Sequence, residues 1–184
     1  MKDDFIAKLE FLSMENGGRS HYAKSGYRPH IKFDEIKGLL TSGQQTYIGQ
    51  ESASPGETVE ASILTIMSKY LTGMLEEGDK FSFSEGPRPI GKGVIKIILK
   101  SQLTLSNIPK GIITIDTINQ FEKETKTPRE LKTPTDYLNH IIEASEVMHK
   151  MEQNEAYKIK LNKLIDKLSY SKEVKEKIQH ITHR

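Results

Sequence analysis

The hydrophobic positions of this chain change their period near residue 100. Before Lys100, apolar and polar residues alternate in short runs that end at glycine or proline, which is the pattern of half-buried β-strands. After Lys100, apolar residues recur every three or four positions, which is the pattern of amphipathic helices. The expected strand regions are residues 4–14, 30–41, 58–67, 79–85 and 91–99. We expect loops at residues 15–29 and 42–57, where Gly, Ser and other turn residues gather.

Glycine use supports the same division. Twelve of the thirteen glycines precede Lys100, and glycine supplies the backbone conformations that tight turns and bulges need. Five or six short strands joined by such turns favour a closed antiparallel barrel, because closure removes exposed sheet edges. We therefore predict an α+β protein in which an N-terminal antiparallel β-barrel over residues 4–99 is followed by a helical extension.

The helical extension divides into a connector and a longer helical region. The connector, residues 100–134, is expected to hold one short helix capped by Asp116 and to end at prolines. Residues 135–184 are expected to form a helical bundle or arm. In that region we expect Thr135 to cap one helix and Ser171 to cap the last one.

One segment, EGPRPIGKGVIKIIL at residues 85–99, begins like a nucleotide-binding P-loop, because Gly86 is followed after four residues by Gly91 and Lys92. A P-loop needs Ser or Thr after the lysine to hold magnesium, and a helix whose N-terminal amides bind the phosphates. Here that position is Gly93, and the Val- and Ile-rich residues that follow predict a strand. We therefore interpret the segment as a turn that leads into a strand.

The composition narrows the functional classes. The chain has no cysteine, which excludes disulfides, thiolate metal ligands and a cysteine nucleophile. Its first residues are charged and alternating, unlike a signal peptide, and no apolar run approaches the ~20 residues of a membrane-spanning helix, so a cytoplasmic location is expected. The net charge of +2 is too small to indicate nucleic-acid binding by itself. No grouping of nucleophile, base and orienting residue is visible, so we expect no enzyme, cofactor or metal.

Four ordered motifs in the first 99 residues resemble those of the C-terminal β-barrel domain, the third domain, of elongation factor Tu. They are Gly-Gly-Arg at 17–19, Gly-Tyr-Arg-Pro at 26–29, Pro-Gly-Glu at 55–57 and Glu-Gly-x-Arg-x-Ile-Gly-x-Gly-Val-Ile at 85–95. The resemblance covers about residues 4–99 and does not extend to the helical region. It implies a barrel without GTPase activity, since the GTP-binding domain of that family is a separate domain whose motifs this sequence lacks.

In that family the barrel contacts the backbone of aminoacyl-tRNA, so the resemblance implies tRNA or another structured RNA as the partner. The nucleic-acid-binding residues that it implies are Arg19, Arg28, His30, Lys37, Glu85, Gly86 and Arg88. Among them, Glu85 and Gly86 match a turn that touches ribose hydroxyls, the groups that distinguish RNA from DNA. A departure from the family pattern is Ser84, which stands where the family has an arginine.

Other interpretations remain open from the sequence. Arg19, Arg28 and Arg88 can instead hold barrel turns by hydrogen bonds to carbonyl groups. The protein can instead be a protein-interaction or regulatory module, such as a mimic of elongation factor Tu that engages a partner protein of a translation factor, or a toxin or immunity protein. The lysines between Lys158 and Lys177 form the solvated face of the helices, or else contact RNA or an acidic partner.

Overall fold

The computed structural model describes residues 3–36, 39–121, 131–150 and 155–182, with side chains left out at 120 and 147–150. The chain forms two compact units, Met1–Thr104 and Leu105–Arg184. In the described part of the chain, no helix has the length and apolar character needed to cross a membrane.

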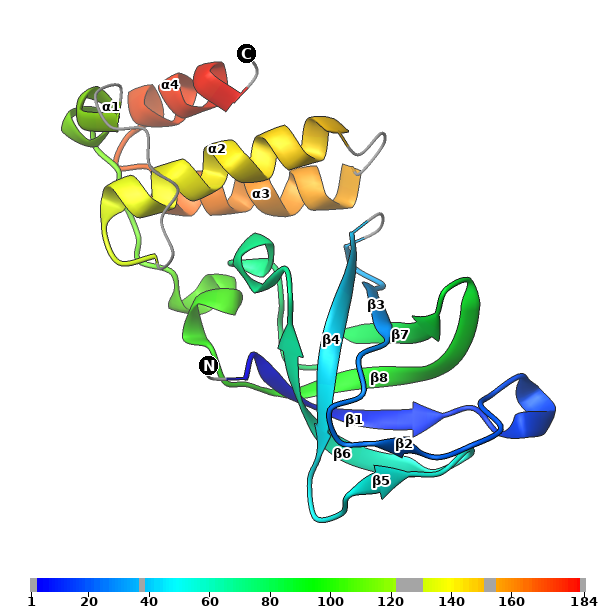
Figure 1. Ribbon diagram of the computed structural model, residues 1–184. Coiled ribbons are helices and arrows are strands. Elements are labelled where there is room, and N and C mark those ends of the chain that lie inside the picture. Colours follow the sequence, from blue (N-terminus) through cyan, green and yellow to red (C-terminus); the bar gives the residue numbers. More distant parts are fainter. Residues whose placement is uncertain (1–2, 37–38, 122–130, 151–154, 183–184) are drawn as a thin grey trace. The chain divides into compact units, whose positions relative to one another are not determined.

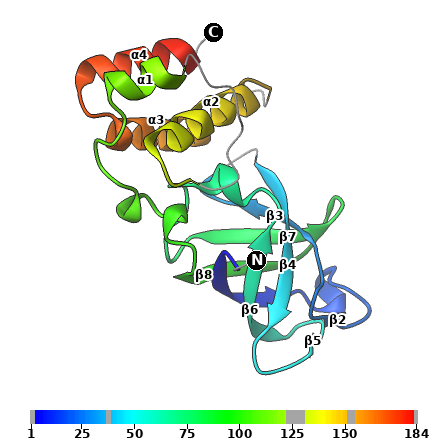
Figure 2. The same ribbon diagram turned by 60° about the vertical axis from the view of Figure 1, so that its left-hand side comes forward.

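The first unit is a closed six-stranded antiparallel β-barrel, which confirms the predicted fold class (Figure 1). Around the barrel the strands are β1 (Phe5–Phe11), β6 (Thr58–Thr65), β4 (Leu40–Tyr47), β3 (His30–Phe33), β7 (Lys80–Glu85) and β8 (Arg88–Ile98), and β8 pairs again with β1. Two shorter strands, β2 (Ala23–Lys24) and β5 (Ser52–Ala53), pair with each other outside the barrel, as Figure 1 and Figure 2 both show. The 3-10 helices of this unit are η1 (Met14–Asn16), η2 (Ser68–Leu71) and η3 (Ser101–Leu103).

Phenylalanine rings fill the barrel interior. Phe5, Phe33 and Phe81 pack against one another with ring centroids 5.7 to 6.1 Å apart. Two glycines of β8 make this packing possible, because a Cβ at Gly93 would overlap the Phe81 ring and a Cβ at Gly91 would overlap a second ring, that of Phe83. Of the glycines that resembled a phosphate-binding loop, Gly91 and Gly93 therefore lie in a strand that packs on the aromatic core, and Gly86 lies in the turn before that strand.

The loop predicted at residues 42–57 is wrong at its start, because β4 continues to Tyr47. The inward residues of this strand are Thr41, Gly43, Gln45 and Tyr47, all buried. Most of them are polar or small, so the strand lacks the alternation of apolar and polar residues that marks the others. The small residue at 43 is required by packing, since a Cβ there would overlap the side chain of Ile31.

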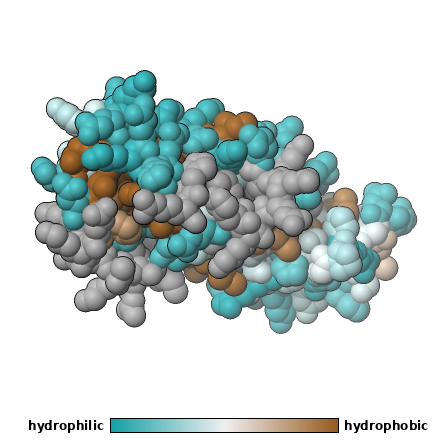
Figure 3. Space-filling model, turned by 90° about the horizontal axis from the view of Figure 1, so that it is seen from above, coloured by the Kyte–Doolittle hydropathy of each residue, from teal (hydrophilic) through white to brown (hydrophobic). Residues whose placement is uncertain are grey.

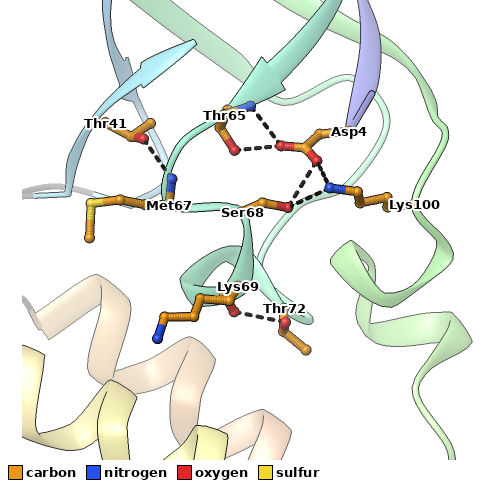
Figure 4. Close-up of polar contacts among 8 residues, drawn as sticks. All are labelled: Asp4, Thr41, Thr65, Met67, Ser68, Lys69, Thr72 and Lys100. Carbon is orange, nitrogen blue, oxygen red and sulfur yellow. Dashed lines mark hydrogen bonds and ion pairs between the residues drawn. The ribbon is translucent and has the colours of Figure 1, made fainter. Parts of the chain in front are cut away.

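A buried carboxylate joins the ends of several barrel strands (Figure 4). Asp4, which is fully buried, accepts hydrogen bonds from the backbone N–H and the hydroxyl of Thr65 at 2.8 and 2.5 Å. Its other carboxylate oxygen accepts from the Ser68 hydroxyl at 2.9 Å and from the Lys100 ammonium at 2.5 Å. This network links the segment before β1 to the end of β6, to η2 and to the segment that follows β8.

The second unit contains η4 (Leu105–Asn107) and four α-helices: α1 (Ile115–Phe121), α2 (Pro134–Lys150), α3 (Glu155–Leu168) and α4 (Lys172–Thr182). The predicted cap at Ser171 is confirmed, since its hydroxyl accepts from the Val174 N–H at 3.3 Å. The caps predicted at Thr135 and at Asp116 are wrong by two residues each. Thr133 caps α2, with Pro134 in the first turn where its missing N–H costs nothing, and Thr114 caps α1.

The glycine positions of β8 make a test of the core packing. Gly93→Ala places a methyl group against the Phe81 ring, and we expect it to lower the free energy of unfolding by about 1–3 kcal/mol. Lys96→Ala changes an exposed residue of the same strand and is expected to change it by less than about 0.5 kcal/mol. Urea unfolding of the full chain measures both, and equal stability of the two variants would contradict this account of the glycines.

The Asp4 network makes a second test. Asp4→Asn keeps the shape of the side chain but leaves the Lys100 ammonium without its carboxylate, and we expect a loss of about 3 kcal/mol in the free energy of unfolding. Adding Lys100→Met removes that cation, so the double variant should be more stable than the single one. If the double variant were instead less stable by the sum of both changes, the ion pair would not be the reason for the loss.

Candidate functional site

Arg19, Tyr27 and Glu85 meet at one end of the barrel. An Nη1–H of Arg19 is bonded to the Glu85 carboxylate, and the Tyr27 hydroxyl donates to the same oxygen at 2.8 Å. The guanidinium carbon of Arg19 lies 4.6 Å from the centre of the Tyr27 ring, a cation–π distance. The Arg19 side chain is 21 % exposed and that of Glu85 is 43 % exposed. Arg19 and Glu85 therefore form an ion pair with each other, within the protein.

The surroundings of Tyr27 change its ionisation. Burial raises the pKa of the Tyr27 phenol, and its hydrogen bond to the Glu85 carboxylate raises it further. Burial also raises the pKa of Tyr47, whose hydroxyl donates to Gln45 at 3.2 Å. Both phenols stay protonated near neutral pH, so they act here as hydrogen-bond donors rather than as bases.

Gly86 lies in the turn between β7 and β8, and Arg88 is the first residue of β8. The Arg88 side chain donates from Nε to the Gly17 carbonyl at 2.8 Å and from Nη2 to the Gly18 carbonyl. Gly86 has a φ of 56°, a conformation that glycine adopts at no steric cost in such a hairpin turn. Arg88 thus holds the loop at residues 17–18 against the hairpin, and its side-chain hydrogen bonds go to carbonyl groups of this loop.

The other residues implied by the resemblance lie apart from this cluster. Arg28 is exposed and donates from Nε and Nη2 to the Gln44 side chain at 3.0 and 2.5 Å. His30 begins β3, half-buried, opposite Ser42 on one neighbouring strand and Ser84 on the other. Lys37 lies outside the described residues. The structure thus brings Arg19, Glu85, Gly86 and Arg88 together and places Arg28 beside β4.

A second group of cations, which the sequence did not single out, lies on the outer wall of β3, β7, β8 and β1. The strand register places Lys32, Ser82, Lys92 and Glu10 in one row across these four strands. The adjacent row holds Lys80, Val94 and Lys8. We call the four lysines the lysine wall: Lys8, Lys32, Lys80 and Lys92.

Three lysines of the wall, Lys8, Lys80 and Lys92, line a hollow of about 370 Å³, near the lower end of the range of ligand-binding pockets, roughly 300–1,000 Å³. The polar side chains around the hollow are Lys8, Glu10, Asp34, Lys80, Ser82 and Lys92, and Val94 contributes an apolar part. Within the described chain, one ion pair occurs in the wall, between Lys92 and Glu10 at 3.3 Å. The wall therefore offers ammonium groups to an outside anion, in contrast to the internally bonded arginines at 19 and 88.

The lysines of the helical unit are mostly occupied. Lys175 pairs with Asp166 at 2.5 Å, Lys172 pairs with Glu176, and Lys177 pairs with Glu173. Lys167 donates to the Leu105 and Ser106 carbonyls. In the view of Figure 3 the described surface is mostly hydrophilic, with hydrophobic residues in small separate groups. Four lysines of this unit therefore have bonding partners within it.

Two further observations concern cofactors and relatives. Across residues 3–36, 39–121, 131–150 and 155–182, no group of three or more His, Asp and Glu side chains is placed to hold a metal ion. No protein-family model matches the chain. The lysine wall is thus one arrangement on the barrel that an external anion could contact.

The Tyr27 cluster predicts a pH dependence. The folded state holds the Tyr27 proton more tightly than an unfolded chain, in which tyrosine ionises near pH 10. The stability from this residue is therefore complete below about pH 10 and is lost as the pH rises further. We expect the free energy of unfolding to fall more steeply between about pH 10 and 11 in the wild type than in Tyr27→Phe. Parallel curves for the two proteins would contradict the raised pKa.

Proposed function

We propose that the protein is a non-catalytic RNA-binding module that resembles the C-terminal barrel of elongation factor Tu and contacts tRNA or another structured RNA. The contact surface in this proposal is the lysine wall. The observation that carries the proposal is the row of Lys32, Ser82 and Lys92 across three paired strands, with Lys80 and Lys8 in the adjacent row.

The lysines of the wall are spread over four strands rather than gathered at one point. Lys80 and Lys8 lie two strands apart, which is roughly 10 Å, and so do Lys32 and Lys92. Cations that neutralise phosphates supply most of the affinity of sequence-independent binding. Because the wall has only four lysines, with Glu10 and Asp34 at its edge, we expect weak binding that depends strongly on salt.

The hydroxyl groups beside the lysines favour RNA over DNA in this proposal. Ser82 and Ser84 point outward from β7, and His30 lies opposite Ser84 on β3. Serine hydroxyls and an imidazole can exchange hydrogen bonds with the ribose 2′-hydroxyl, which DNA lacks. In this assignment Arg88 and Arg19 have a structural role, since their hydrogen bonds go to residues of the barrel.

The test is binding of bulk tRNA, and of a DNA hairpin of equal length, to the full chain at about 50 mM salt. Lys8→Gln with Lys80→Gln should weaken tRNA binding by about fivefold or more and reduce the slope of log K against log salt by about two. The matched control is Lys158→Gln with Lys163→Gln, which removes the same charge from exposed positions of α3. The control should bind as the wild type does.

Three results would count against this function. They are no tRNA binding by the wild type, an equal loss in both double variants, and equal affinity for RNA and DNA. The first would remove RNA as the ligand, the second would reduce the effect to net charge, and the third would remove the role assigned to the hydroxyl groups.

A further inference from the structure

The outer wall of β4 and β6 differs in chemistry from the lysine wall. Leu40, the first residue of β4, is 52 % exposed, and Ile66, which directly follows β6, is 75 % exposed. The register places Leu64 opposite Gln44, and the Ile66 N–H donates to the Ser42 carbonyl at 2.9 Å. No lysine occurs at the positions of β4 and β6, which the structure describes in full.

A hollow of about 290 Å³ lies in this wall, lined by Arg28, Ser42, Gln44, Leu64, Thr65 and Ile66. It therefore combines two apolar side chains, Leu64 and Ile66, with one cation and three uncharged polar residues. We call these six residues and Leu40 the apolar wall. Apolar side chains that gather around a hollow, with a polar group at the edge, are typical of sites that hold a bulky side chain of a partner.

Arg28 supplies the charge at this hollow. Both of its hydrogen bonds go to the neutral amide oxygen of Gln44, which orients the guanidinium without cancelling its charge. Its Nη1 donates to no acceptor in the part of the chain that the structure describes. A carboxylate from outside can therefore bond to Nη1 as a charge-assisted acceptor.

We propose that the apolar wall docks a segment of a partner protein that carries an acidic residue beside a leucine, isoleucine or phenylalanine. The apolar side chain enters the hollow between Leu64 and Ile66, and the carboxylate binds Arg28. RNA fits this wall poorly, because it has one cation and exposed leucine and isoleucine side chains. The apolar wall shares no residue with the lysine wall, which it adjoins where Leu40 lies opposite Lys32, and this proposal does not rest on the proposed RNA binding.

The experiment is selection of random 12-residue peptides displayed on phage against the immobilised full chain. We expect enriched peptides to share an acidic residue next to a bulky apolar one. Each enriched peptide is then synthesised and its affinity measured for the wild type, for Arg28→Met and for Ile66→Ser. Arg28→Met keeps the apolar stem but removes the charge, and it should weaken binding by about tenfold, as should the loss of the Ile66 side chain.

Two matched controls separate this site from the rest of the surface. Lys24→Met removes a cation from an exposed position of β2, and Tyr170→Ser removes an apolar side chain that is 74 % exposed in the helical unit. Both should leave peptide affinity unchanged. A failed selection, enriched peptides without the acidic and apolar pair, or equal binding to Arg28→Met and the wild type would overturn the proposal. So would a loss of tRNA binding in Arg28→Met without a loss of peptide binding, since it would assign this wall to RNA.

Discussion

The barrel depends on a single carboxylate that has no access to water. Asp4 lies just before β1, and its side chain receives hydrogen bonds from Thr65 and Ser68 and the ion pair with Lys100. Its backbone carbonyl accepts from the N–H groups of Leu99 and Lys100, and its N–H donates to Ile63. One residue therefore ties the first strand to both of its neighbours, β6 and β8, at the point where the sheet closes. A buried charge with four donors is stable only while all of its partners stay in place, so the network also fixes the segment that leads into η2.

Much of the barrel was predictable from alternation, because strands such as β1 and β7 place aromatic and aliphatic residues inward and Lys, Glu or Ser outward. β4 was not predictable in this way. Its inward positions hold Thr41 and Gly43, which fit beside larger neighbours such as Ile31. A sequence pattern does not show which side chains on other strands a residue will pack against, so it cannot show where a small residue is needed. The helix caps at Thr133 and Thr114 were missed for a related reason, since several residues near each start could cap and only the backbone decides between them.

The candidate site was predictable only in part. The alternative that arginines hold barrel turns through carbonyl groups describes Arg88, which donates to the Gly17 carbonyl, but the motifs did not indicate that Arg19 would bond to Glu85. The lysine wall left no local signal, because alternation says that Lys80 faces outward and says nothing about which strand lies beside it. Strand order and register bring Lys80 and Lys8 to the two sides of Val94, and these are properties of the closed sheet.

The alternation of side chains along each strand determines both which residues fill the core and which residues form the lysine wall and the apolar wall. Side chains of a strand alternate between its faces, so the inward positions of Gly91 and Gly93, which make room for the rings of Phe83 and Phe81, require that Lys92 points outward. On the far side, the inward Gly43 requires that Ser42 and Gln44 point outward, where Gln44 orients Arg28. A register slip of one residue would bring Lys92 against the aromatic core and expose the glycines. The packing of the phenylalanine rings therefore decides where cations appear on the outside, and the chemistry of both walls follows from the shape of the interior.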